Sequence, residues 1–160
     1  MADLSPQFNS VQEARAFVES LQPKSGLHRQ KGNREFLDTQ TTRALMKAVN
    51  IRSWPLQVHV GDIRDLDMGH GQSVVRPHET LHTTQSHLHV PTLQKYLKGD
   101  IPEHDPLYAP DEVPYHPEVA YDEHGNPWIE EGHHRLVTSR LNEYPYQEVY
   151  TGSISPKHRS

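Results

Sequence analysis

The last third of the chain contains the pattern that most restricts its fold. Val119 and Tyr121 occupy alternating positions, and the glycine-containing segment 122–126 separates them from a second apolar pair, Trp128 and Ile129. Alternation on both sides of a short turn is typical of a β-hairpin. The chain is therefore expected to contain a sheet.

A glycine joins this predicted hairpin to a helix. Gly132 follows the second strand, and apolar and long side chains then recur at helical spacing, at Leu136, Val137, Arg140 and Leu141. Residues 146–150 read as a closing strand. The order strand, glycine turn, helix, strand predicts an α/β (α+β) domain with a small mixed sheet and flanking helices.

Helices are also predicted earlier in the chain. Apolar residues at three- and four-residue spacing predict helices over 11–21 and 41–49, and Pro91 and Gly99 bracket a short helix over 91–97. Alternation over 56–60 predicts a strand.

Two stretches of the sequence predict loops instead of regular elements. Residues 61–89 offer no long periodic segment. The proline-rich stretch 100–111 reads as an acidic loop, because proline interrupts both helices and strands.

The composition limits both the core and the chemistry. Only 33% of the residues are apolar, and there are 13 prolines, 13 histidines and no cysteine. A small core with long loops is expected, and thiol chemistry, disulfides and thiolate zinc sites are excluded. No apolar run approaches the roughly 20 residues of a membrane-spanning helix, and no signal peptide is visible, so we expect a cytoplasmic protein without membrane contact.

Charge is distributed unevenly along the chain. The net charge is −5, but the first 52 residues hold more Lys and Arg than Asp and Glu. A basic loop over 26–35 contains His28, Arg29, Lys31 and Arg34. Because the molecule as a whole repels polyanions, any contact with nucleic acid must come from a local patch, and this loop is the candidate for contacting nucleic acid or a protein.

The turn at Gly132 could hold an anion. A glycine between strand and helix leaves the first N–H groups of the helix available to a phosphate, and Arg135 can add a bidentate contact. His133 and His134 point about a hundred degrees apart, so at most one of them faces a ligand. Glu131 is a candidate general base or metal ligand. Alternatively, Gly132 only permits a tight turn and Arg135 is a solvated helix charge.

Residues 128–141, Trp-Ile-Glu-Glu-Gly-His-His-Arg-Leu-Val-Thr-Ser-Arg-Leu, resemble the strand, Gly-x-x-Arg turn and helix of the ParB/sulfiredoxin superfamily. They are most similar to its phage-type ParB-like domains, with a Gly-His-His-Arg turn. Thr84-Gln85 and the helix over 91–97 are similar to an earlier box of that family. The resemblance spans about residues 55–152. It implies a ParB-like phosphate-binding domain over 53–152, preceded by a helical annex over 1–52 and followed by a tail over 153–160.

The resemblance implies roles for individual residues. The phosphate-binding residues would be Gly132, His133, His134 and Arg135, with Thr84 and Gln85. From their position at the turn, and not from the resemblance, we take Glu131, His133 and His134 as the candidate catalytic residues. The chain also departs from the family: sulfiredoxins have cysteine at the position of His133, so reductase activity is excluded. Partitioning ParB proteins carry Gly-Glu-Arg-Arg, which argues against CTP switching, and no helix-turn-helix is expected after the closing strand.

Two kinds of metal site are open alternatives. His82, His87 and His89 could bind zinc or another transition metal, or they could be ordinary polar histidines. Residues 100–131 contain many acidic residues and no Lys or Arg. They form either a solvated face or a Mg²⁺ or other divalent-cation site beside the turn, formed from Asp122, Glu123, Glu130 or Glu131.

These observations lead to one expected function and two alternatives. We expect binding of a nucleotide or nucleic-acid phosphate at the Gly-x-x-Arg turn, with phosphoester hydrolysis, as in a nuclease, or phosphoryl transfer as the reaction, in a phage or mobile-element setting. The first alternative is a non-catalytic interaction protein that binds a host or viral protein. The second is a histidine-rich metal-binding module.

Overall fold

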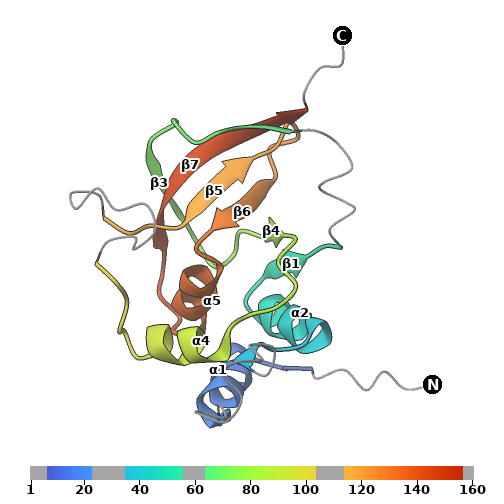
Figure 1. The fold of residues 1–160 in the computed structure, drawn as a ribbon, viewed down its shortest axis with the longest axis vertical. Helices are drawn as coiled ribbons and strands as arrows, with labels where there is room; N and C mark the ends of the chain where they lie inside the picture. Colours follow the sequence, from blue (N-terminus) through green and yellow to red (C-terminus); the bar gives the residue numbers. More distant parts are fainter. Residues whose placement is uncertain (1–6, 23–34, 56–63, 104–113, 157–160) are drawn as a thin grey trace.

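The computed structural model describes residues 7–22, 35–55, 64–103 and 114–156, which form a mixed α/β structure (Figure 1). These residues contain four helices: α1 (Val11–Ser20), α2 (Thr39–Ala48), α4 (Val90–Leu97) and α5 (His133–Leu141). Their seven strands are β1 (Ile51–Ser53), β2 (Arg64–Asp67), β3 (Gln72–Val75), β4 (Leu81–Thr83), β5 (Glu118–Tyr121), β6 (Pro127–Glu131) and β7 (Gln147–Pro156). In the view of Figure 1 the helices gather below the sheet.

The sheet is parallel at one side and mixed at the other. Its strand order is β1-β4-β6-β5-β7-β2, with β3 also paired to β7. Strands β1, β4 and β6 run parallel to one another, with Ile51 opposite Leu81 and His82 opposite Trp128. Strand β5 is antiparallel to β6 and parallel to β7. The carboxyl ends of β1, β4 and β6 therefore meet at one edge, where the chain leaves each strand.

Local capping interactions define where the helices begin. The Ser10 hydroxyl accepts the N–H of Glu13 at the start of α1, and the Asp38 carboxylate accepts the N–H of Thr41 at 2.7 Å at the start of α2. Pro91 lies in the first turn of α4, where no intrahelical N–H donor is required. These signals are local, which is why the sequence predicts all three helices.

Strand β7 is continuous, and two strands share one of its edges. Strand β3 pairs with its first half and β2 with its second half, both antiparallel. The connecting segment crosses β7 at Gly152, where an added Cβ would collide with the backbone oxygen of Asp67 and with the Met68 sulfur. Only glycine leaves room for this crossing.

The core lies on both faces of the sheet, but unequally. On the helix side, Val119 and Ile129 join a cluster that includes Leu45 of α2 and Leu136 of α5. On the other side, Ala120 and Trp128 pack with Ile154 in a smaller cluster. Neighbouring residues of β5 and β6 thus alternate between the two faces. The helices of residues 1–52 share one core with the rest of the described chain.

The structure extends the sequence prediction in one region. Within 61–89, where no long periodic segment is visible, it contains β2, β3 and β4. Each of these strands has three or four residues, too few for alternation to be recognised. The expected boundary between residues 52 and 53 falls inside β1, and β7 continues past residue 152.

Some sequence predictions fall outside the described residues, namely the strand over 56–60, most of the basic loop over 26–35 and most of the acidic loop over 100–111. None of the described helices has the length and apolar character needed to cross a membrane.

Candidate phosphate-binding site

The turn between β6 and α5 has the backbone geometry of an anion-binding turn. Gly132 is the N-cap of α5 and adopts a left-handed conformation with φ of +86°. A Cβ added here would lie 2.7 Å from the Cα and Cβ atoms of Pro117. Conformation and crowding both require glycine, as the position between strand and helix predicts.

The first turn of α5 presents backbone donors. The first backbone bond within the helix runs from the N–H of Leu136 to the carbonyl of Gly132. The N–H groups of His133, His134 and Arg135 come before it and have no acceptor within the helix. Together with the helix dipole they favour an anion at this end.

Arg135 is held against the segment before β5. One of its guanidinium nitrogens donates to the backbone carbonyl of Tyr115, and the guanidinium carbon lies 5.4 Å from the centre of the Tyr115 ring. The side chain is half-buried, and burial lowers the pKa of Arg135 below its usual range. An arginine has five N–H donors, so one bond to a carbonyl leaves the other guanidinium N–H groups able to bind a ligand.

His133 forms a hydrogen bond to the neighbouring strand β4. Its Nε2 lies 2.6 Å from the hydroxyl oxygen of Thr83, which in turn accepts the N–H of Gln85. The His133 ring also bonds to the backbone of Ile129, so the imidazole has partners on two neighbouring strands. Burial lowers the pKa of His133 to about 3, with a smaller contribution from His134. The imidazole is therefore neutral at physiological pH.

His134 forms a hydrogen bond to the start of helix α4. Its Nε2 accepts the backbone N–H of His89 at 2.9 Å, at the N-cap of α4. Burial lowers the pKa of His134 to about 4, with a further contribution from His89. Neither histidine of the Gly-His-His-Arg turn adds a positive charge to a ligand site at neutral pH. Both instead fix the start of α5 against its neighbours.

The loop after β4 lies at the same edge of the sheet as the glycine turn. The threonine that contacts this turn is Thr83, whereas the family resemblance implies Thr84. Thr83, which is 1% exposed, bonds to His133, whereas Thr84 lies next to it in the chain. The backbone carbonyl of Gln85 accepts the hydroxyl of Ser53 at 2.7 Å, and its side-chain amide donates to the carbonyl of His87. Gln85 therefore connects β1 to the loop after β4. Sequence reasoning missed Thr83 because nothing local distinguishes adjacent threonines.

The acidic residues proposed for a divalent cation lie at two different ends of β6. Glu130 and Glu131 precede Gly132, but Asp122 and Glu123 lie in the hairpin turn before the strand. The five residues of β6, at about 3.3 Å each, separate the two groups by roughly 16 Å. The Asp122 carboxylate accepts the N–H groups of His124 and Asn126 and the indole N–H of Trp128. Asp122 is a turn residue, and Glu131 is the acid that adjoins the glycine turn.

The histidines proposed as zinc ligands point to separate partners. The Nδ1 of His82 accepts the indole N–H of Trp54 at 3.0 Å. The Nδ1 of His87 bonds to the carbonyl of Leu37, and His89 bonds to Thr92 through Nδ1 and to Glu35 through Nε2. In the described part of the chain no three His, Cys, Asp or Glu side chains are grouped as a metal site would require.

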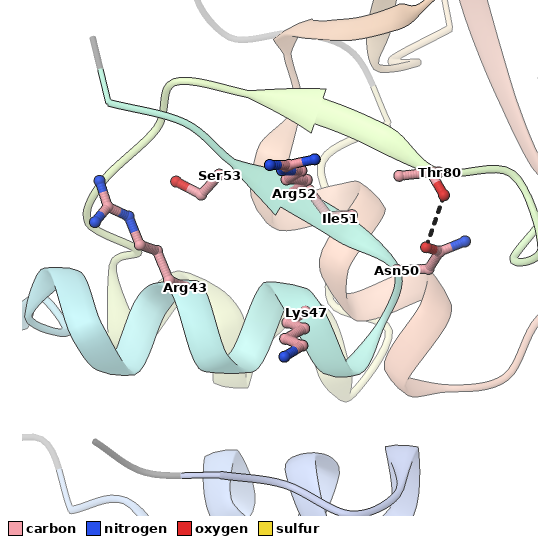
Figure 2. A pocket seen from close by; sticks show the side chains of 7 residues that line it. All are labelled: Arg43, Lys47, Asn50, Ile51, Arg52, Ser53 and Thr80. Carbon is pink, nitrogen blue, oxygen red and sulfur yellow. Dashed lines mark hydrogen bonds between the residues drawn. The ribbon is translucent and has the colours of Figure 1, made fainter. Parts of the chain in front are cut away.

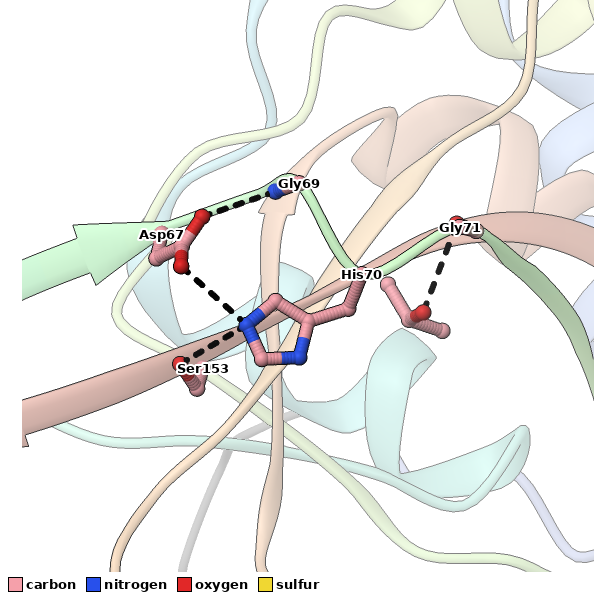
Figure 3. A network of polar contacts seen from close by, with 6 residues as sticks. Asp67, Gly69, His70, Gly71 and Ser153 are labelled. Carbon is pink, nitrogen blue, oxygen red and sulfur yellow. Dashed lines mark hydrogen bonds and ion pairs between the residues drawn. The ribbon is translucent and has the colours of Figure 1, made fainter.

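A second polar cluster, in the β2–β3 connection, has residue types of a catalytic triad but different geometry. Figure 3 shows Asp67, His70 and Ser153 in contact, with the carboxylate and the hydroxyl each 3.3 Å from the same ring nitrogen, Nε2. A relay needs the acid and the nucleophile on opposite nitrogens of the imidazole. This exposed cluster is therefore a turn-stabilising network, in which Asp67 also accepts the N–H of Gly69.

Comparisons with protein-family models, with curated proteins and with solved structures found no match to this chain.

Proposed function

We propose that this chain is a ParB-like domain that binds a phosphate of a nucleotide or nucleic acid at the turn Gly132–Arg135. The observation that carries the proposal is the left-handed Gly132 at the start of α5, with Pro117 filling the space of a Cβ. A ParB/sulfiredoxin-like fold agrees with the mixed sheet and with the order of β6, α5 and β7.

The donors that a phosphate would use are the backbone and one arginine. The N–H groups of residues 133–135 belong to the first turn of α5. Arg135 is the third residue of this helix, and its side chain is half-buried. Backbone donors at a helix N-terminus need no side-chain charge to bind an anion. His133 and His134 serve as positioning residues, because each ring already bonds to a neighbouring element.

The position of the turn in the sheet also supports a ligand site. The loops that follow β1, β4 and β6 leave the same edge, at the carboxyl ends of the parallel strands. Ligands of α/β sheets bind at this edge. Hydrogen bonds from Ser53 to Gln85 and from Thr83 to His133 connect the three loops there.

The binding proposal is tested by a thermal-shift panel of nucleotides and inorganic phosphate, with and without Mg²⁺. A ligand at 100 times its Kd would stabilise the protein by about 2.7 kcal/mol. Arg135→Ala should weaken binding by about 1.5 to 3 kcal/mol, the scale of a charged hydrogen bond, and Arg135→Lys should restore only part of it. Arg15→Ala, which removes an exposed arginine on α1, is the matched control. Equal affinities of the wild type and Arg135→Ala in a calorimetric titration contradict the proposal.

The reaction proposed for this site is phosphoester hydrolysis or phosphoryl transfer, with a divalent cation as cofactor and Glu131 as base or ligand. Glu131→Gln keeps the shape and removes the charge, so it should abolish turnover and preserve binding. Glu123→Gln, at the other end of β6, should leave turnover unchanged. If the purified protein cleaves no DNA, RNA or nucleoside triphosphate with any divalent cation, the protein binds without turnover, as an interaction module would.

A further inference from the structure

A pocket of about 390 Å³ lies between helix α2 and strand β1, and its lining does not include the glycine turn (Figure 2). We call it the basic pocket; its lining consists of Arg43, Lys47, Asn50, Ile51, Arg52, Ser53 and Thr80. Three of these residues are cationic and none is acidic. Strand β1 is an end strand of the sheet order, so the pocket lies along the sheet's edge.

The three cations do not form ion pairs with the described acidic residues. Arg43 and Lys47 are exposed and four residues apart on α2, and Arg52 is exposed on β1. The described ion pairs all involve other residues. The Arg52 guanidinium lies 3.6 Å above the ring of Trp54, which orients it. These charges are thus available to a ligand.

The neutral polar groups of the basic pocket are already bonded within the protein. The Thr80 hydroxyl donates to the side-chain oxygen of Asn50 at 2.9 Å, and the Asn50 amide donates to the carbonyl of Pro77. The Ser53 hydroxyl donates to the carbonyl of Gln85. What the pocket offers is therefore positive charge, with little capacity to recognise a base or a sugar.

A fourth positive charge lies behind the pocket wall. Arg140 is 5% exposed and donates to the carbonyls of Val49 and Asn50, where α2 joins β1. Burial lowers the pKa of Arg140 to about 10, while Glu79 acts in the opposite direction. The guanidinium stays charged at neutral pH and raises the potential at this end of the molecule.

We infer that the basic pocket binds the phosphodiester backbone of a nucleic acid. In Figure 2 Arg43 and Lys47 extend from α2 and Arg52 extends from β1, and the three side chains do not converge on one point. That spacing suits successive phosphates of an extended chain better than a single phosphate. Contacts of this type fix position and affinity and do not read the sequence. The net charge of −5 confines attraction to such a patch. The inference does not require a ligand at Gly132.

The test is the salt dependence of oligonucleotide binding, measured by fluorescence anisotropy with labelled single- and double-stranded oligonucleotides of two unrelated sequences. Three phosphate contacts predict a slope of log K against log salt of about −2 for single strands and about −3 for duplexes. The variant R43Q/K47Q should bind about tenfold more weakly at low salt and reduce the steepness of the slope by about 1.4 to 1.8. The loss should be equal for both sequences.

Matched variants separate this pocket from general charge effects and from the glycine turn. K95Q/K98Q also removes two exposed positive charges, on and just after α4, and should change neither the affinity nor the slope. R52K keeps the charge and should keep the slope. Circular dichroism checks that each variant is folded.

The outcomes distinguish this inference from the proposed function. If R43Q/K47Q binds oligonucleotides with the affinity and slope of the wild type, the inference is overturned. It is also overturned if K95Q/K98Q loses as much affinity, or if free nucleotide or inorganic phosphate, at matched ionic strength, displaces the oligonucleotide from the wild type but not from R43Q/K47Q. Arg135→Ala tests only the turn: loss of nucleotide binding in that variant with an unchanged oligonucleotide slope shows two separate sites.

Discussion

The hydroxyl of Thr83 and the imidazole of His133 meet at 2.6 Å, although fifty residues separate them in the sequence. Thr83 is the last residue of β4, and His133 is the first of α5. The bond holds the start of α5 against the parallel part of the sheet. His133, proposed from the sequence as a phosphate-binding residue, thus bonds to Thr83 within the protein.

Thr83→Val should destabilise the protein, because it keeps the shape of the side chain but removes the partner of the His133 Nε2 and of the Gln85 N–H. A buried donor or acceptor left unpaired costs about 1 to 3 kcal/mol. Thr83→Ser should recover most of this loss. Thr80→Val, at an exposed threonine, should change the free energy of unfolding by less than about 0.5 kcal/mol. Urea denaturation measures all three, and equal stability of Thr83→Val and the wild type would show that the bond is unimportant.

Stability should fall as the pH drops from about 6.5 towards 4. The pKa values of His133 and His134 are about 3 and 4 in the folded protein and about 6.5 in an unfolded chain. The unfolded chain therefore binds protons first, so the contribution present above pH 6.5 is lost as the pH falls towards the folded values. The lowered pKa values of Asp38, Asp67 and Asp122 act in the same direction and add to the loss at the acidic end of this window, below about pH 5.

His134→Gln measures the share of His134 in this pH dependence. Glutamine can accept the N–H of His89 but does not titrate, so the melting temperature should depend less steeply on pH between 6.5 and 4. The matched control is His124→Gln, because the His124 side chain is 76% exposed. A pH dependence that is the same in His134→Gln and the wild type would rule out His134 as a source.

Gly132→Ala should cost more stability than Gly99→Ala, although both glycines have a φ of +86°. A Cβ at residue 99 meets nothing within 4 Å, whereas at residue 132 it lies 2.7 Å from Pro117. Gly99→Ala should therefore cost only the left-handed conformation, about 1 to 2 kcal/mol. Gly132→Ala adds the displacement of Pro117. Equal losses in chemical denaturation would mean that Pro117 moves aside without cost.

Arg140→Ala should be the most destabilising of these substitutions. The Arg140 guanidinium donates to the carbonyls of Val49, Asn50, Arg76 and Glu79, which come from two separate segments. Its removal leaves these acceptors unpaired and opens a cavity, at a cost of about 3 to 5 kcal/mol. The exposed Arg15, which pairs with Glu19, is the control, and its replacement by alanine should cost about 0.5 kcal/mol or less. Thermal and urea unfolding together measure the difference.

The sequence by itself determined the elements that depend on local signals. Helical spacing predicted α1 and α2, and Pro91 and Gly99 predicted α4. Alternation around a turn predicted the β5–β6 hairpin. The glycine at position 132 predicted the turn from strand to helix at the candidate site. Each of these features involves residues within a few positions of one another, so a single sequence contains all the information needed.

Only the tertiary structure decided which side chains meet. Strands β1 to β4 are too short for periodicity to reveal them, and their pairing depends on β6 and β7, far along the chain. In the folded chain His133 and His134 form hydrogen bonds to neighbouring elements, and Asp122 bonds to Trp128 at the end of β6 opposite the glycine turn. Arg43, Lys47 and Arg52 line one pocket. The physical reason is that burial and hydrogen-bond partners, which set the charge and availability of a side chain, come mostly from residues distant in sequence.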